Sequence, residues 1–205
     1  MRVPFIPTAS SCAICSRHVE GAADGFICGD CKGRSRPHFD RAACAVRFEG
    51  KARDMLLDYK FEKRIYLKSD FADWLEGAAR ARFDTEAVDA VAYMPISPEH
   101  ARLRGYNQCE FLARELAMRL DRKLLRGALR RIGHPRRQSG LGEEERRENA
   151  KGTFAAADGR YLRGRTILLV DDIMATGATL SESARSLKEA GAWRVWCIAV
   201  ARSVR

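Results

Sequence analysis

The sequence predicts an α/β domain with a parallel sheet, preceded by a small metal-binding module. Short apolar runs alternate with stretches of helical periodicity, and the run 167–170 is apolar on both faces, as in a central strand of a parallel sheet. A four-cysteine cluster stands apart from this pattern near the N-terminus. Gly, Ser, Pro and charged residues interrupt the periodicity at 33–41, so we expect a module over 1–40 and an α/β domain over 41–205.

The N-terminal module has the ligand spacing of a structural zinc site. Cys12 and Cys15 form one Cys-x-x-Cys pair, and Cys28 and Cys31 form a second one twelve residues later. Two such pairs complete a tetrahedral Zn²⁺ site with no open position. The gap between the two pairs is slightly shorter than the roughly 15–20 residues usual in zinc ribbons. The alternative is that the cysteines form a redox pair or remain unligated thiols.

The composition agrees with a cytoplasmic protein that keeps its thiols reduced. The chain has 205 residues, 46% hydrophobic content and seven cysteines, an odd number that disfavours a disulfide framework. The remaining cysteines, Cys44, Cys109 and Cys197, are expected to be small buried side chains. No apolar run reaches the roughly 20 residues that a membrane span requires, and the opening residues lack the apolar core of a secretion signal.

The expected elements of the α/β domain follow in chain order. They are a strand at 45–48, a helix that passes into a loop at 55–64, a helix over 71–79, a strand at 87–94, a loop at 95–107, a helix over 112–120, a strand at 167–170, a helix over 180–187 that ends before Gly191, and a last strand at 195–200.

The stretch 166–179 carries the strongest candidate site. Asp171 and Asp172 follow the apolar strand, where open α/β sheets place their ligands. A small, hydroxyl-rich loop then leads into a helix, whose free N–H groups and dipole suit a phosphate. An acid pair that merely caps the next turn is the alternative. The loop comprises Ala175, Thr176, Gly177, Ala178 and Thr179.

This order of strand, two acids, loop and helix resembles the phosphoribosyl pyrophosphate (PRPP) loop of type I phosphoribosyltransferases. The resemblance implies that Asp171 and Asp172 face the ribose hydroxyls and contribute to catalysis, while the 175–179 loop binds the 5-phosphate. It also implies Mg²⁺ bound together with PRPP. Ala175 stands where the family often has a second threonine, so one hydroxyl donor is missing and the backbone amides remain.

Further strings narrow the resemblance to the ComF family of competence-associated proteins, which implies a zinc ribbon fused to a type I phosphoribosyltransferase domain and a role in natural transformation. The family implies no particular acceptor. The strings follow the four cysteines in the order LLDYKF, RGYNQCEFLA, RRQSGLGEEERRENAKGTF and LLVDDIMATGATL.

The loop 95–107 occupies the place where type I phosphoribosyltransferases hold pyrophosphate. Arg102 and Arg104 are the expected contacts, because guanidinium groups match phosphate oxygens. Solvated arginines at a helix start are the alternative.

The basic segment, residues 122–151, holds ten Lys or Arg against four Glu. Its glycines, proline and lack of long apolar runs predict a mobile flap. The resemblance to type I phosphoribosyltransferases implies a flexible loop here that closes over PRPP, with Arg136, Arg137 or Gln138 on pyrophosphate. Alternatively Arg130, Arg131, Arg136 and Arg137 would contact a nucleic-acid backbone, or the segment is a solvated surface that pairs its own charges.

Two functions therefore stay open. The first is an enzyme that binds Mg²⁺ and PRPP and transfers the phosphoribosyl group with loss of pyrophosphate. The second is a non-catalytic competence factor that binds single-stranded DNA and uses PRPP only as a ligand. The implied partners are PRPP, single-stranded DNA and the DNA-uptake machinery at the membrane.

Overall fold

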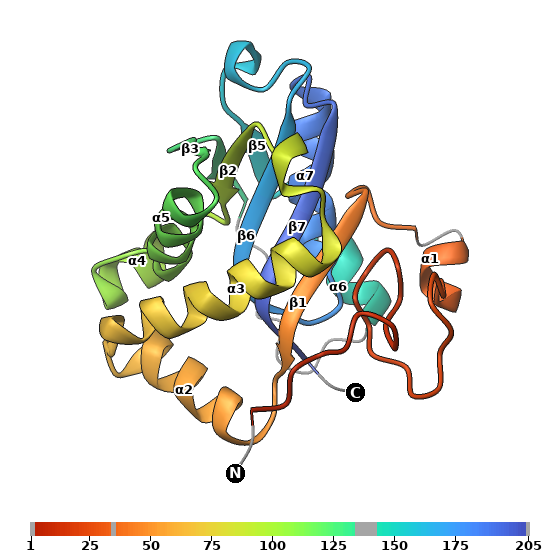
Figure 1. Ribbon diagram of the computed structural model, residues 1–205. Coiled ribbons are helices and arrows are strands. Elements are labelled where there is room, and N and C mark those ends of the chain that lie inside the picture. Colours follow the sequence, from red (N-terminus) through yellow and green to blue (C-terminus); the bar gives the residue numbers. More distant parts are fainter. Residues whose placement is uncertain (1–2, 34–35, 134–142, 204–205) are drawn as a thin grey trace.

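A five-stranded parallel sheet forms the centre of the computed structural model, which describes residues 3–33, 36–133 and 143–203 (Figure 1). The strand order is β1-β7-β6-β2-β3, and two further strands form a separate antiparallel ribbon, β4-β5. The strands are β1 (Arg41–Arg47), β2 (Ala90–Tyr93), β3 (Lys123–Leu124), β4 (Leu129–Arg131), β5 (Phe154–Ala156), β6 (Thr166–Met174) and β7 (Arg194–Arg202).

Helices cover both faces of the sheet and account for most of the connections. The α-helices are α1 (Gly29–Lys32), α2 (Gly50–Phe61), α3 (Lys68–Arg82), α4 (Pro98–Arg104), α5 (Gln108–Arg119), α6 (Glu143–Ala150) and α7 (Ala178–Glu189). Short 3₁₀ turns are η1 (Ile65–Leu67), η2 (Thr85–Ala87) and η3 (Gly159–Tyr161). In the described parts of the chain, no helix is both long and apolar enough to cross a bilayer.

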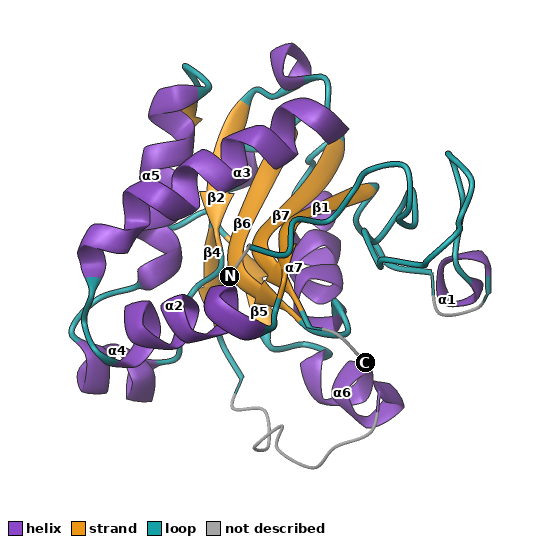
Figure 2. Cartoon of the chain, turned by 60° about the horizontal axis from the view of Figure 1, so that its bottom comes forward, coloured by secondary structure: helices purple, strands orange, loops and turns teal. Residues whose placement is uncertain are grey.

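Both faces of the sheet are buried, as the side chains of the central strand β6 illustrate. Ile167 and Leu169 face the cluster that contains α7 and the β4-β5 ribbon, whereas Leu168 and Val170 face the cluster that contains α2, α3 and α5. All four side chains are fully buried. Figure 2 shows the resulting layers, with α3 and α5 on one side of the sheet and α7 on the other. The predicted α/β fold with a parallel sheet is confirmed.

The N-terminal module packs along the outer edge of β1. The amide of Ile6 donates to the carbonyl of Ala45 over 2.9 Å, and the amide of Ala42 donates to the carbonyl of Ile14 over 2.6 Å. The guanidinium of Arg82 in α3 donates to the carbonyl of Cys12. The module therefore covers an edge that would otherwise expose unpaired backbone groups.

Three regions differ from the expected elements. The loop 95–107 contains α4, because Ser97 caps it by accepting from the amide of His100 (3.2 Å), Pro98 starts it, and Gly105 ends it at φ 80°. The strand at 167–170 continues to Met174, since β7 pairs with it that far. The basic segment has regular structure at both ends, with β3 and β4 on one side of residues 134–142 and α6 on the other.

Candidate functional site

The four cysteines of the N-terminal module form one buried cluster. Their sulfur atoms all lie within 4.8 Å of one another, and each residue is at most 5% exposed. The sulfurs of Cys15 and Cys28 are 3.7 Å apart, which matches the roughly 3.8 Å separation of two thiolates in a tetrahedral site with Zn–S bonds of about 2.3 Å. The backbone amide of Cys28 also donates to the sulfur of Cys12 (3.3 Å), as suits a thiolate. The residues present fit a structural Zn²⁺.

The acid pair lies within β6, and the two carboxylates have different surroundings. Asp172 is 5% exposed, whereas Asp171 is half-buried. Together with the thiol of Cys109, at the start of α5, they form a compact group of side chains. Both acids lie within β6 because this strand pairs with β7 as far as Met174.

Asp172 is held by donors from the protein itself. Its Oδ2 accepts from Lys60 Nζ at 2.8 Å and from Gln108 Nε2 at 2.9 Å, while its Oδ1 accepts from the amide of Ile173 at 2.7 Å. Burial opposes ionisation, but the charge and hydrogen bond of Lys60 and the bond from Gln108 outweigh it and lower the pKa of Asp172. Asp172 is therefore a carboxylate already satisfied inside the fold.

Asp171 has one oxygen left for a ligand. Its Oδ1 accepts from the amide of Asp172 (2.9 Å) and from the thiol of Cys109 (3.4 Å), and none of the described residues donates to its Oδ2. Burial, reinforced by the neighbouring carboxylate of Asp172, raises the pKa of Asp171 to about 7. Burial and the two carboxylates raise the pKa of Cys109 as well, so this residue is a neutral thiol donor.

The 175–179 loop turns β6 into α7 through a conformation that requires glycine. Gly177 has φ 82°, and a Cβ there would lie 2.6 Å from Cε of Met174. Thr176 Oγ1 accepts from the amide of Ala178 (3.2 Å), so this hydroxyl shapes the turn. The other amides of the first turn of α7 have no acceptors within the helix, which is the arrangement that binds phosphate. Ala175 is exposed, and Thr179 is half-buried beside this turn.

A cavity of about 260 Å³ lies between this loop and the four-cysteine cluster of the N-terminal module. Cys15 and Cys31 line one wall, and Thr176 and Gly177 line another. The buried Arg202, at the end of β7, also lines it, and its Nη1 has no hydrogen-bond partner among the described residues. The four-cysteine cluster and the 175–179 loop thus line one cavity.

The two arginines of α4 lie in its last turn instead of in an irregular loop. Arg102 is exposed, and Arg104 stacks its guanidinium 5.1 Å from the ring centroid of Phe61. Arg104 Nε is buried without a hydrogen-bond partner among the described residues. Of the two, Arg104 is the better placed to bind an anion.

The arginines of the basic segment face in different directions. Arg130 and Arg131 are neighbours in β4, so their side chains alternate: Arg130 is exposed, whereas Arg131 turns inward and lies 5.5 Å from the ring centroid of Phe154. Burial lowers the pKa of Arg131, and the nearby charge of Asp171 opposes this. Arg131 therefore belongs to the acid-pair side of the molecule. Arg136 and Arg137 lie outside the described residues.

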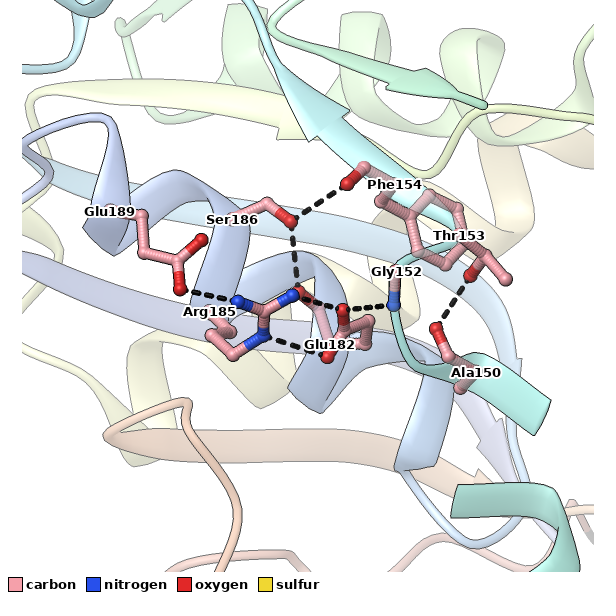
Figure 3. A network of polar contacts seen from close by, with 8 residues as sticks. All are labelled: Ala150, Gly152, Thr153, Phe154, Glu182, Arg185, Ser186 and Glu189. Carbon is pink, nitrogen blue, oxygen red and sulfur yellow. Dashed lines mark hydrogen bonds and ion pairs between the residues drawn. The ribbon is translucent and has the colours of Figure 1, made fainter. Parts of the chain in front are cut away.

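The C-terminal end of the basic segment and the strand β5 that follows it meet α7, the helix that begins at the 175–179 loop. Figure 3 shows the buried carboxylate of Glu182 accepting from the amide of Gly152 (2.7 Å) and from Arg185 (2.5 and 3.0 Å). Ser186 Oγ donates to the carbonyl of Phe154 over 3.0 Å, which fixes β5 and with it the paired strand β4. The end of the basic segment is thus fastened to the helix that follows the 175–179 loop.

Four residues of this arrangement were not predicted as site residues from the sequence: Lys60, Gln108, Cys109 and Glu182. Lys60 gave only a weak signal, as one lysine between two aromatic residues at the end of an expected helix. Gln108 begins α5 directly after Asn107, which is the N-cap and accepts from the amide of Cys109 at 3.0 Å. Cys109 is buried as expected, yet it also donates to Asp171.

Comparison with known proteins agrees with this geometry. Residues 107–204, which include the acid pair and the 175–179 loop, match the phosphoribosyl transferase domain family. Competence protein F of Haemophilus influenzae is 28% identical over 180 residues, covering 86% of this chain and 78% of that protein. The DNA utilization protein YhgH of Escherichia coli K12 is 25% identical over 205 residues, covering 91% of this chain and 88% of that protein.

Among solved structures, the glutamine PRPP amidotransferase of B. subtilis, complexed with ADP and GMP, aligns with a TM-score of 0.46 at 17% identity, covering 70% of this chain and 30% of that chain. The α/β fold with its five-stranded parallel sheet is as expected from the sequence, and residues 107–204 match the phosphoribosyl transferase domain family. With its four-cysteine N-terminus, the chain belongs to the ComF/YhgH family of proteins with a phosphoribosyltransferase domain.

Proposed function

We propose that the protein binds PRPP with Mg²⁺ at Asp171 and the 175–179 loop, and that it serves competence and DNA utilization in the cytoplasm. One combination of features carries the proposal. Asp171 keeps one carboxylate oxygen free, which can accept a hydrogen bond from a ribose hydroxyl. At the end of the same strand, the turn at Gly177 leads into the twelve-residue helix α7, whose N-terminus can bind a phosphate. The names of the relatives, a competence protein and a DNA utilization protein, support the biological role.

The residues present fit Mg²⁺ only as an ion bound together with the substrate. Magnesium prefers oxygen ligands and keeps several waters, and it is commonly held by one or two carboxylates plus substrate phosphates. Both oxygens of Asp172 already accept hydrogen bonds from the protein, and Cys109 offers sulfur, so the chain contributes chiefly the free oxygen of Asp171. Bound Mg²⁺ would supply positive charge to the pyrophosphate group.

In the proposed reaction the bond between ribose C1 and pyrophosphate breaks, and its electron pair leaves with pyrophosphate. A lone pair of the acceptor forms the new bond to C1, and the acceptor loses a proton. Asp171 orients the ribose and stabilises the positive charge that develops on the ring. Arg104 and Arg131, each with a buried Nε that has no hydrogen-bond acceptor among the described residues, are placed to bind the departing anion.

A second candidate function rests on the exposed Arg130 and the excess of basic residues in the basic segment. In this version the protein binds single-stranded DNA, and PRPP is a ligand without turnover. Positive side chains that follow a phosphate backbone give salt-sensitive affinity with little sequence preference.

Calorimetry with PRPP and Mg²⁺, followed by an assay for released pyrophosphate across candidate bases, tests both versions. PRPP binding with pyrophosphate release supports the enzyme, and binding without release in the presence of every base supports the second candidate. Absence of binding by the zinc-loaded, folded protein would refute the PRPP site itself.

A further inference from the structure

Lys60 is a partly buried cation next to the candidate ribose site. It is the penultimate residue of α2, its side chain is 21% exposed, and its Nζ lies 2.8 Å from Oδ2 of Asp172, whose side chain is 7% exposed. Burial would lower the pKa of Lys60, but Asp172 outweighs this effect and the pKa is raised, so the pair is ionic.

The position of Lys60 is fixed by hydrogen bonds on both sides of it. The hydroxyl of Tyr59 donates to the carbonyl of Gln108 (2.9 Å), and the hydroxyl of Tyr106 donates to the carbonyl of Tyr59 (3.1 Å). Tyr59 is fully buried and packs edge-on against Phe71. The end of α2 is therefore fastened to the start of α5, and both elements approach Asp172.

The contact between Lys60 and Asp172 gives the two adjacent carboxylates different surroundings. Lys60, Gln108 and the amide of Ile173 occupy the oxygens of Asp172, whereas Asp171 keeps Oδ2 free of donors among the described residues. Two neighbouring carboxylates in a buried site repel each other, and one of them is protonated unless a cation compensates. Lys60 is the cation that this fold supplies.

We propose that Lys60 is a positioning residue of the ribose site: by binding Asp172 it keeps one carboxylate within the protein and leaves Asp171 as the carboxylate that meets the ligand. This inference rests on the proposed PRPP site, since only that site gives Asp171 a ligand. Lys60 acts through Asp172, so its removal should change the charge of the acid pair before it changes any other contact.

Several titratable groups lie near Asp171 and Asp172 and influence the pH at which these two carboxyl groups ionise. They are Lys60 from α2, Tyr59 from the same helix, Cys109 from α5, Arg131 from β4, Cys44 from β1 and Cys197 from β7. Burial raises the pKa of both Cys44 and Cys197, so these two thiols stay neutral near neutral pH. Lys60 and Arg131 are the cations of the set.

The test compares Lys60→Met, Lys60→Arg and Lys51→Met, the last being an exposed lysine at the start of the same helix. PRPP affinity in the presence of Mg²⁺ is measured by calorimetry between about pH 6 and 9, where the raised pKa of an acid pair is observable. Lys60→Met should lose about tenfold or more in affinity near neutral pH, as expected for a lost charged hydrogen bond, and should recover part of it at high pH. Lys60→Arg should bind like the parent, as should Lys51→Met.

A second measurement reports on the pair without PRPP. Carboxyl NMR of the free protein should show the titration of Asp171 and Asp172 moving to higher pH in Lys60→Met and staying in place in Lys60→Arg. Removing one partner of a buried ion pair can also unfold the chain, so circular dichroism accompanies each variant. If Lys60→Met fails to fold, Lys60→Met combined with Asp172→Asn removes both charges. This double variant should then be no weaker for PRPP than Asp172→Asn alone.

The outcomes separate the two proposals. An unchanged titration of the acid pair in folded Lys60→Met overturns the role of Lys60, and so does additive loss in the double variant. If instead the parent protein fails to bind PRPP while the titration shifts as described, the PRPP site is wrong and the pairing of Lys60 with the acids stands.

Discussion

The backbone amide of Gly152 donates to the buried carboxylate of Glu182 over 2.7 Å, and so joins the end of the basic segment to the helix that follows the 175–179 loop (Figure 3). Glu182 also binds Arg185, and these bonds lower its pKa. A change at the basic segment can therefore reach the turn that we assign to phosphate through one carboxylate.

Glu182→Ala should destabilise the protein by about 1–3 kcal/mol, because it leaves the amide of Gly152 and the guanidinium of Arg185 without their buried acceptor. Urea denaturation measures the change. Glu189→Ala removes the exposed partner of the same arginine and is the matched control, with an expected loss below about 1 kcal/mol. Equal losses in the two variants would contradict the anchoring role of Glu182.

Purified protein should contain about one zinc per chain, as four clustered thiolates require. Cys28→Ser should lose the metal, whereas Cys44→Ser, at a buried cysteine outside the cluster, should retain it. Metal retention should also fall in acid, since thiolates must be deprotonated to bind. Elemental analysis that finds no zinc in protein purified without chelator would refute the assignment. Metal loss should in addition weaken PRPP binding, because Cys15 and the 175–179 loop line one cavity.

Asp171→Asn should weaken PRPP binding about tenfold or more, the effect of one charged hydrogen bond of roughly 1.5–3 kcal/mol. Asp121→Asn changes an exposed aspartate at a positive φ, which asparagine tolerates, and should bind PRPP like the parent. Calorimetry with Mg²⁺ gives the affinities. Equal affinity in the two variants, with native circular dichroism, would place the ligand elsewhere.

Asp171→Asn should also change the pH dependence of stability. The pKa of Asp171 is raised on folding to about 7, so its contribution to stability is fully present below its unfolded pKa and is lost as pH rises through about 7. Asparagine has no such loss. Relative to the parent, the thermal midpoint of Asp171→Asn should therefore rise between about pH 4 and pH 8, while that of Asp121→Asn should keep a constant difference. Parallel curves for both variants would show that Asp171 ionises normally.

Variants of the two neighbouring arginines of β4 should differ in their effects on PRPP binding and on single-stranded DNA binding. Arg131→Ala should weaken PRPP or pyrophosphate binding, because Arg131 faces the acid pair and stacks on Phe154. Arg130→Ala should instead weaken single-stranded DNA binding and reduce its salt dependence by about 0.7 in log affinity against log salt, the value for one phosphate contact. Loss of DNA binding in Arg131→Ala alone would reverse these roles.

The order of the main helices and of the sheet strands with long apolar runs could be predicted from the sequence, because apolar periodicity directly reflects burial. The acid pair and the 175–179 loop could be located for the same reason: the strand before them is apolar on both faces, and small residues follow. The helix α4 escaped prediction because it is short and none of its residues is buried, so it has no apolar periodicity.

The sequence does not predict which of the two acids is bound within the protein and which is left for a ligand. Asp171 and Asp172 are chemically identical in the sequence, and only the arrival of Lys60 and Gln108 from α2 and α5 distinguishes them. These contacts join residues 112 and 64 positions apart, which local patterns do not encode. Likewise, the alternation of Arg130 and Arg131 follows from a strand of three residues, too short to show a period.

The pairing of β1 with β7 has a consequence for synthesis of the chain. The edge strand Arg41–Arg47 is made long before its neighbour Arg194–Arg202, because the other described strands lie between them in the sequence. Until β7 has been made, the nascent chain therefore presents an apolar strand without its partner. Contacts so distant in sequence form slowly, and unpaired strands of this kind are prone to aggregate, so folding in the cell should depend on chaperones more than the modest length of the chain suggests.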